Sequence, residues 1–144
     1  MRSTSLAAAV LSLLSIMSTL ALTPACAADL KISVTGVSSA DGQIMVALYN
    51  SAETYLGKPF RAAAAPAVAG VTQIEFKDLP AGDYAFSLYH DANANGKMDR
   101  NLIGMPTEDY AFSNNAMGKR GAPEYAAARF ALPAPGAATS VSLR

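Results

Sequence analysis

After residue 28, most of the chain alternates between apolar and polar positions, the pattern typical of half-buried β-strands. The clearest run covers residues 84–89, where Tyr84, Phe86 and Leu88 share one side of the predicted strand. The same period of two predicts strands over 30–35, 44–49, 71–76, 125–132 and 138–143. Prolines interrupt the alanine-rich stretch 50–70, so we expect at most a short extended piece there.

Six or seven short strands without a convincing amphipathic helix predict an all-β fold. We expect an antiparallel β-sandwich formed by a single domain, residues 28–144, with one long ordered loop inserted at 91–123. Asp41-Gly42 and the segment 79–83 supply turn signals between strands. Apolar side chains of the loop are expected to pack against one end of the sandwich and order it: Leu102, Ile103, Met105, Tyr110, Phe112 and Met117.

The first 27 residues have the composition of a secretory signal peptide. Arg2 precedes an uncharged apolar run from 6 to 22, and Pro24 comes just before the small-residue triplet Ala25-Cys26-Ala27. These features predict cleavage and export to the periplasm or the exterior. An uncleaved anchor and lipidation at Cys26 are the two alternatives.

Composition narrows the function classes. Eleven basic residues balance eleven acidic ones, so the chain has no basic footprint for nucleic acid. A single cysteine excludes an intrachain disulfide, and a single histidine leaves little for a zinc cluster. We expect a monomer that has no membrane span after cleavage and binds an unknown envelope or extracellular partner.

The segment 91–99 has the spacing of the first half of a calcium-binding loop. Oxygen-bearing side chains stand at alternate positions and Gly96 follows them, where the backbone must turn inward with a positive φ. The predicted calcium ligands are Asp91, Asn93, Asn95, the backbone carbonyl of Lys97, and Asp99, with Glu108 or Asp109 folding back to complete the shell.

The loop departs from the helix–loop–helix calcium motif in two ways. The twelfth position is Leu102, which has no carboxylate, and a strand rather than a helix enters the loop. With few carboxylates and a neighbouring lysine, the affinity for calcium should be weak, roughly 0.1 to 1 mM. The alternative is a metal-free turn in which Asp and Asn side chains cap their own backbone.

Several short motifs together resemble a bacterial family. His90-Asp91-x-Asn93-x-Asn95-Gly96-Lys97-x-Asp99 is followed by Gly104-x-Pro106-x-Glu108-x-Tyr110 and Phe112-Ser113-Asn114-Asn115, and preceded by Leu79-Pro80-x-Gly82-x-Tyr84-Ala85. The chain is similar over nearly all of its predicted mature part to exported proteins grouped as domain of unknown function number twenty-one forty-one. Ala111 stands where such families usually have Gly. The resemblance implies an exported β-sandwich and no established activity. A weaker resemblance links the Leu-Pro-x-Gly-x-Tyr turn to transthyretin-like and collagen-binding-B-type sandwiches.

Three functions fit these observations. The first is a non-enzymatic binding or envelope-interaction module with a calcium-type loop. The second is a hydrolase or lyase that uses Glu108, Asp109 and His90 beside a bound ion. The third is a structural domain without a ligand. The polar segment 113–115, with Lys119 and Arg120 after it, is either a recognition tip or a solvated loop.

Overall fold

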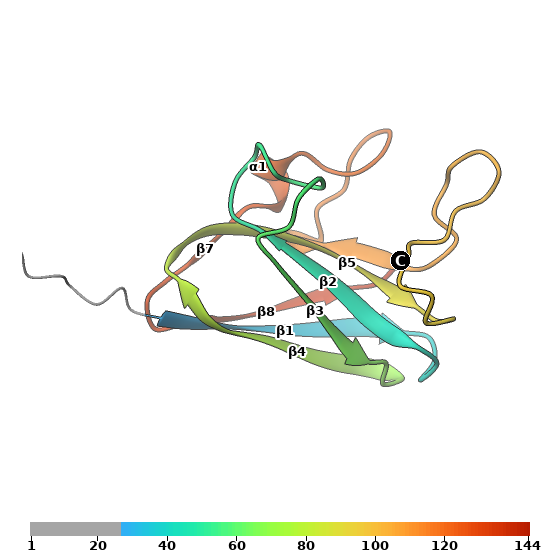
Figure 1. Cartoon of the computed structure of the whole chain (residues 1–144), viewed down its shortest axis with the longest axis horizontal. Coiled ribbons are helices and arrows are strands. Elements are labelled where there is room, and N and C mark those ends of the chain that lie inside the picture. Colours follow the sequence, from blue (N-terminus) through green and yellow to red (C-terminus); the bar gives the residue numbers. More distant parts are fainter. Residues whose placement is uncertain (1–26) are drawn as a thin grey trace, which may run out of the picture.

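The computed structural model describes residues 27–144, which form two β-sheets facing each other across one apolar core (Figure 1). The predicted signal peptide lies outside the described residues except for Ala27, which begins the first strand. The strands are β1 (Ala27–Val37), β2 (Gln43–Tyr49), β3 (Arg61–Pro66), β4 (Gly70–Pro80), β5 (Gly82–Asp91), β6 (Tyr110–Phe112), β7 (Phe130–Leu132) and β8 (Ala137–Ser142). The predicted all-β fold is confirmed, and the described part of the chain has eight strands rather than six or seven.

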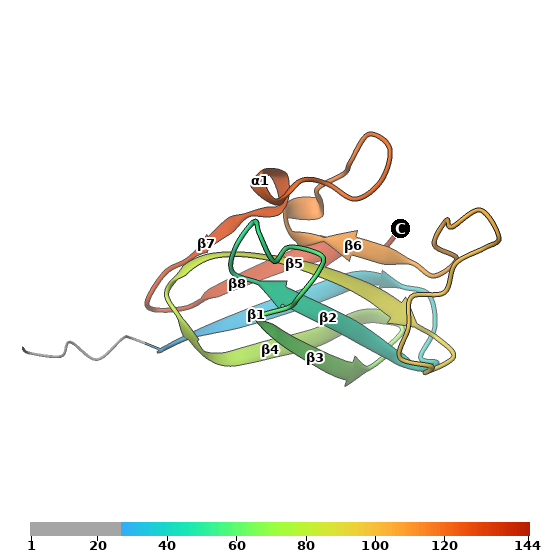
Figure 2. The same cartoon turned by 45° about the horizontal axis from the view of Figure 1, so that its top comes forward.

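The chain crosses between the sheets several times. One sheet has the order β4-β1-β8, and the other has the order β3-β2-β5-β6 with β7 also paired to β5 (Figure 2). The turn at 38–42 carries the chain from β1 to β2, and Ala81 alone separates β4 from β5. Both crossings therefore join the two sheets directly. The second connects the end of β4, an edge strand of one sheet, to the start of β5, a central strand of the other.

The predicted alternation places the core correctly. The apolar face of each long strand is buried, and the core side chains include Leu30, Ile32, Val34, Ile44, Val46, Leu48, Ile74, Phe76, Tyr84, Phe86 and Leu88. Since side chains of a strand alternate between its faces, one apolar residue in two is enough to fill the space between the sheets.

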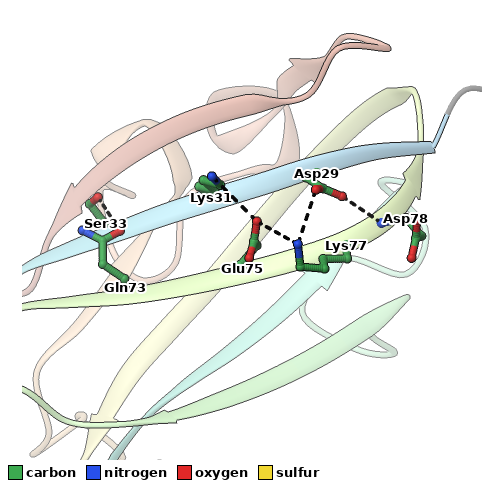
Figure 3. Close-up of polar contacts among 7 residues, drawn as sticks. All are labelled: Asp29, Lys31, Ser33, Gln73, Glu75, Lys77 and Asp78. Atoms are coloured by element: carbon green, nitrogen blue, oxygen red, sulfur yellow. Dashed lines mark hydrogen bonds and ion pairs between the residues drawn. The ribbon is translucent and has the colours of Figure 1, made fainter.

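The outer face of the three-stranded sheet is polar (Figure 3). Residues that face each other in the β1–β4 register pair there: Lys31 lies 3.9 Å from Glu75, and the Ser33 hydroxyl donates a 2.9 Å hydrogen bond to Gln73. Lys77 bridges Glu75 and Asp29 at 3.4 and 3.6 Å. Such exposed pairs add little stability. They keep an edge strand charged, which disfavours pairing with another chain.

Two expectations about the strands are wrong. Residues 125–132 are not one strand, because the helix α1 (Tyr125–Ala128) occupies the first half and β7 the second. The run Tyr-Ala-Ala-Ala lacks large alternating residues, and alanine favours helix. The sandwich is also not wholly antiparallel, since β8 runs parallel to β1 with Val141 opposite Val34.

The segment 91–123 contains more regular structure than expected, and most of its apolar side chains do not pack against the sandwich. It includes β6, which extends the second sheet, and the short 3-10 helix η1 (Ser113–Asn115). Tyr110 and Phe112 are half-buried on β6, but four of the residues predicted to pack are exposed: Leu102, Ile103, Met105 and Met117. The segment is instead held by hydrogen bonds of its backbone and polar side chains.

Candidate cation-binding loop

The loop 91–99 begins where the last residues of β5 meet the β1–β2 turn. The ring Nε2 of His90 donates a 2.7 Å hydrogen bond to the carbonyl oxygen of Asp41, since a carbonyl can only accept. Gly42 has φ +64° and lies so close to the loop that a methyl group there would overlap the carbonyl oxygen of Asp91. The Asp-Gly turn predicted from sequence is therefore also the support on which the loop rests.

Asp91 is the best-anchored side chain of the loop. It is fully buried, and its Oδ1 accepts the backbone N–H of Asn95 at 3.0 Å. Its Oδ2 accepts the N–H of Gly96 at 2.8 Å and the side-chain amide of Gln43 at 3.0 Å. The Gln43 amide, followed by the backbone N–H groups, lowers the pKa of the Asp91 carboxyl, while burial works in the opposite direction. Asp91 is therefore a charged, buried side chain whose hydrogen bonds fix the course of the loop.

Three further side chains of the loop converge on one another. The amides of Asn93 and Asn95 donate to the two carboxylate oxygens of Asp99, at 2.6 and 2.9 Å. Each asparagine Oδ1 also accepts a backbone N–H two residues ahead, so both residues form Asx turns. Ala94 (φ 55°) and Gly96 (φ 75°) supply the left-handed conformations that wind the chain around this centre.

Glu108 returns to the loop, as the sequence suggested. Its Oε2 accepts the backbone N–H of Asp99 at 2.9 Å. Asp109 contributes differently, because its backbone carbonyl accepts the N–H of His90 at 2.9 Å. Lys97 is exposed, and its backbone N–H is bound by Asn95. The structure thus brings Asp91, Asn93, Asn95, Asp99 and Glu108 together and leaves the lysine side chain at the surface.

The loop carries negative charge without a basic partner. Burial raises the pKa of Tyr89, and the nearby carboxylates of Asp91, Glu108 and Asp99 raise it further. Of the ion pairs found within residues 27–144, none includes any of these three carboxylates. In the same part of the chain, no three His, Cys, Asp or Glu side chains form a metal-binding group. Asparagine and backbone oxygens would therefore have to be among the ligands of any cation bound here.

The proposed acid–base trio is not arranged as an open site. His90 is buried and held by Asp41, and Glu108 caps a backbone N–H. A cavity of about 10 Å³ lies elsewhere, beside Tyr110 and Met117. In this structure the side chains of His90 and Glu108 are therefore both engaged in hydrogen bonds that hold the loop.

The segment 113–115 links β5, α1 and β8 through hydrogen bonds, with Ser113 buried and Asn114 and Asn115 exposed. The buried Ser113 Oγ accepts the N–H of Phe86 at 3.0 Å and donates to the carbonyl of Ala128 at 2.6 Å. Asn114 donates to two carbonyls near α1, and Asn115 accepts the N–H of Ser142 at 2.9 Å. The sequence alone did not reveal this role, because a run of three polar residues gives no sign that the Ser113 hydroxyl points into the protein.

Each motif behind the family resemblance now has a place in the fold, from the Leu79–Tyr84 crossing to the loop and the segment 113–115. The family described as "Uncharacterized protein conserved in bacteria (DUF2141)" matches residues 32–140. The chain belongs to this family. No curated protein and no solved structure shows significant similarity to this chain. In the DUF2141 chain, no helix within residues 27–144 has the length and apolar character needed to cross a membrane.

Proposed function

We propose that the protein is an exported, non-catalytic binding module whose 91–99 loop takes up calcium. The observation that carries the proposal is the meeting of Asn93, Asn95 and Asp99 at one point beside the buried Asp91. Oxygen ligands at alternate positions followed by a left-handed glycine are what a hard, flexible-geometry cation such as Ca²⁺ requires. The proposal of export rests on the N-terminal sequence alone.

Charge supports the same proposal. Asp91, Asp99 and Glu108 gather around Tyr89 without an ion pair, and like charges held close together disfavour the folded state. A divalent cation would relieve this repulsion. Each asparagine Oδ1 uses one lone pair on a backbone N–H and retains a second. Asp99 would exchange the two amide N–H groups for the ion, so the loop needs little rearrangement to bind it.

Thermal melting in EDTA, in calcium and in magnesium tests the proposal. Ca²⁺ at ten times its dissociation constant should stabilise the fold by about 1.4 kcal/mol, which corresponds to a rise in Tm of about 4–6 °C. Magnesium should act more weakly, because it demands six ligands in strict octahedral geometry and gives up water reluctantly. Equal melting temperatures in all three solutions would overturn the proposal.

A matched pair of variants makes the test specific. Asp99→Asn removes the carboxylate at the convergence point, so the calcium-dependent rise in Tm should disappear. Asp78→Asn changes an exposed aspartate in β4 that already has a positive φ of 56°, a conformation that asparagine accepts. This control should keep the full response.

The competing function is a structural loop that needs no ion. It is favoured by one observation: both oxygens of Asp91 and both oxygens of Asp99 already accept hydrogen bonds from the protein. On that reading, Asp99→Asn lowers Tm by the same amount in EDTA and in calcium. The two functions are therefore separated by whether the effect of the substitution depends on calcium.

A further inference from the structure

A small hairpin at 99–107 holds aliphatic side chains out in solvent. Leu102 is 106% exposed and Ile103 is 83% exposed, and Met105 beside them is also exposed. Single exposed apolar residues are ordinary, but three within four positions at the tip of one loop form a cluster. The hairpin projects away from the two sheets in both views (Figures 1 and 2).

The tip is ordered by its own polar groups rather than by its apolar ones. The side chain of Asn101 accepts the N–H groups of Ile103 and Met105 at 3.1 and 3.0 Å. Its backbone pairs with Met105 and Gly104, both at 2.9 Å. Lower down, the Thr107 N–H donates to the Asp99 carbonyl at 2.9 Å. Leu102 and Ile103 therefore contribute nothing to the packing of the fold, and yet they are held in a fixed outward position.

Basic groups lie along the hairpin, while carboxylates gather at its base. Arg100 donates a 3.0 Å hydrogen bond to the carbonyl oxygen of Gly104 within the hairpin, whereas Glu108 accepts the backbone N–H of Asp99 at the base. The loop 116–122 carries Lys119 and Arg120 without an acidic residue. That second loop also exposes Met117, and in Figures 1 and 2 it projects on the same side as the hairpin. Aliphatic side chains with basic groups beside them on the outward side match the acyl chains and phosphates of an anionic lipid surface.

We propose that the 99–107 hairpin is a membrane-insertion spike: Leu102 and Ile103 enter the outer part of an anionic bilayer while Arg100 and Lys119 contact its phosphates. The shape favours lipid over a protein partner, because a convex tip with a fully exposed leucine offers too little area for a specific protein interface, which buries about 800 Å² per partner. The proposal does not depend on calcium binding in the adjacent loop.

A tryptophan placed at the tip tests insertion directly. The chain contains no tryptophan, so Leu102→Trp gives a probe that reports on the tip alone, whatever the rest of the full chain does. With vesicles containing phosphatidylglycerol, its emission should shift to shorter wavelength and should be quenched by lipids labelled in the acyl chain. Val68→Trp is the matched control, since Val68 is exposed in the β3–β4 turn and hydrogen-bonded to Thr72. Its emission should not change.

Vesicle partitioning supplies the second test. Replacing Leu102 and Ile103 together by serine should lower the partition coefficient on anionic vesicles by at least about tenfold, with an unchanged Tm. Lys119→Gln, at an exposed position, should lower it by about fivefold on anionic vesicles and leave binding to pure phosphatidylcholine unaltered. An unshifted Leu102→Trp spectrum would overturn the proposal. So would a self-association of the wild type that the double serine variant abolishes, because the tip would then bind a second copy of the chain.

Discussion

The Tyr84 hydroxyl donates a 2.7 Å hydrogen bond to the carbonyl oxygen of Pro80, and this contact spans the point where the chain passes from one sheet to the other. Tyr84 is buried near the start of β5 and Pro80 is the last residue of β4. The Leu-Pro-x-Gly-x-Tyr motif thus serves as a clasp: the tyrosine ring fills the core while its hydroxyl fixes the crossing. Similar tyrosine-to-backbone contacts stabilise corners in other β-sandwiches.

Removing this hydroxyl should weaken the fold. Tyr84→Phe keeps the ring in the core and deletes only the hydrogen bond, so the free energy of unfolding should fall by about 1 kcal/mol. Urea denaturation at neutral pH measures the change, and an unaltered m-value would show that the compactness of the unfolded state is the same. A variant as stable as the wild type would mean that the clasp contributes nothing.

The same substitution at Tyr55 should have the opposite sign. The Tyr55 hydroxyl is buried without a hydrogen-bond partner, and its ring lies edge-on between Tyr49 and Tyr125. Tyr55→Phe should therefore leave the free energy of unfolding unchanged or raise it by up to about 1 kcal/mol. Urea denaturation beside Tyr84→Phe provides the comparison. A clear loss of stability would show that the hydroxyl is not an uncompensated polar group.

Alkaline pH should enlarge the difference in unfolding free energy between Tyr55→Phe and the wild type. Burial, and then the neighbouring Tyr49, raise the pKa of Tyr55 from 10.0 to about 12. The unfolded chain therefore loses this proton near pH 10 while the folded chain holds it, so the fold loses stability as the pH rises from 10 toward 12. The phenylalanine variant lacks this loss. Its advantage over the wild type should grow across that interval, as equilibrium unfolding at a series of pH values would show.

The buried hydroxyl of Ser113 joins β5 to the end of α1, and its removal should be costly. Ser113→Ala leaves the Phe86 N–H and the Ala128 carbonyl without their partner inside the protein. We expect a loss of about 2 kcal/mol in the free energy of unfolding, measured by thermal or urea unfolding. Ser140→Ala, at an exposed position of β8, is the matched control and should change stability by less than about 0.5 kcal/mol.

Periodicity predicted the faces of the strands but not their partners. Alternation placed Leu30, Ile32 and Val34 in the core, yet it carries no information on direction, so the parallel pairing of β8 with β1 was missed. Burial likewise does not follow from apolar character alone, because most buried residues are apolar but many apolar residues are exposed. Leu102 and Ile103 are large aliphatic residues that were expected to pack against the sandwich, and they are exposed.

The candidate loop was more predictable because its geometry is local. Alternate oxygen ligands and a left-handed glycine act over a few residues, and Asn93, Asn95 and Asp99 meet as their spacing indicates. The partners that come from far along the chain were missed. Gln43 binds Asp91 because the two residues lie opposite each other in the β2–β5 register, and His90 binds the Asp41 carbonyl because the β1–β2 turn lies beside the end of β5.

Acid should abolish the contribution of Asp91 to stability. Hydrogen bonds, first from Gln43 and then from the backbone, lower the folded-state pKa of Asp91 below the ordinary value of 3.8. The stabilisation is therefore complete above that value and is lost as the pH falls through the folded pKa. Asp91→Asn should be less stable than the wild type at neutral pH, because an amide N–H₂ would face the donors of Gln43 or Gly96. The gap should close below about pH 4, while Asp78→Asn follows the wild-type curve throughout. Urea unfolding from pH 7 down to pH 2 measures this difference in unfolding free energy. A difference that stays constant with pH would show that the Asp91 charge is not what stabilises the loop.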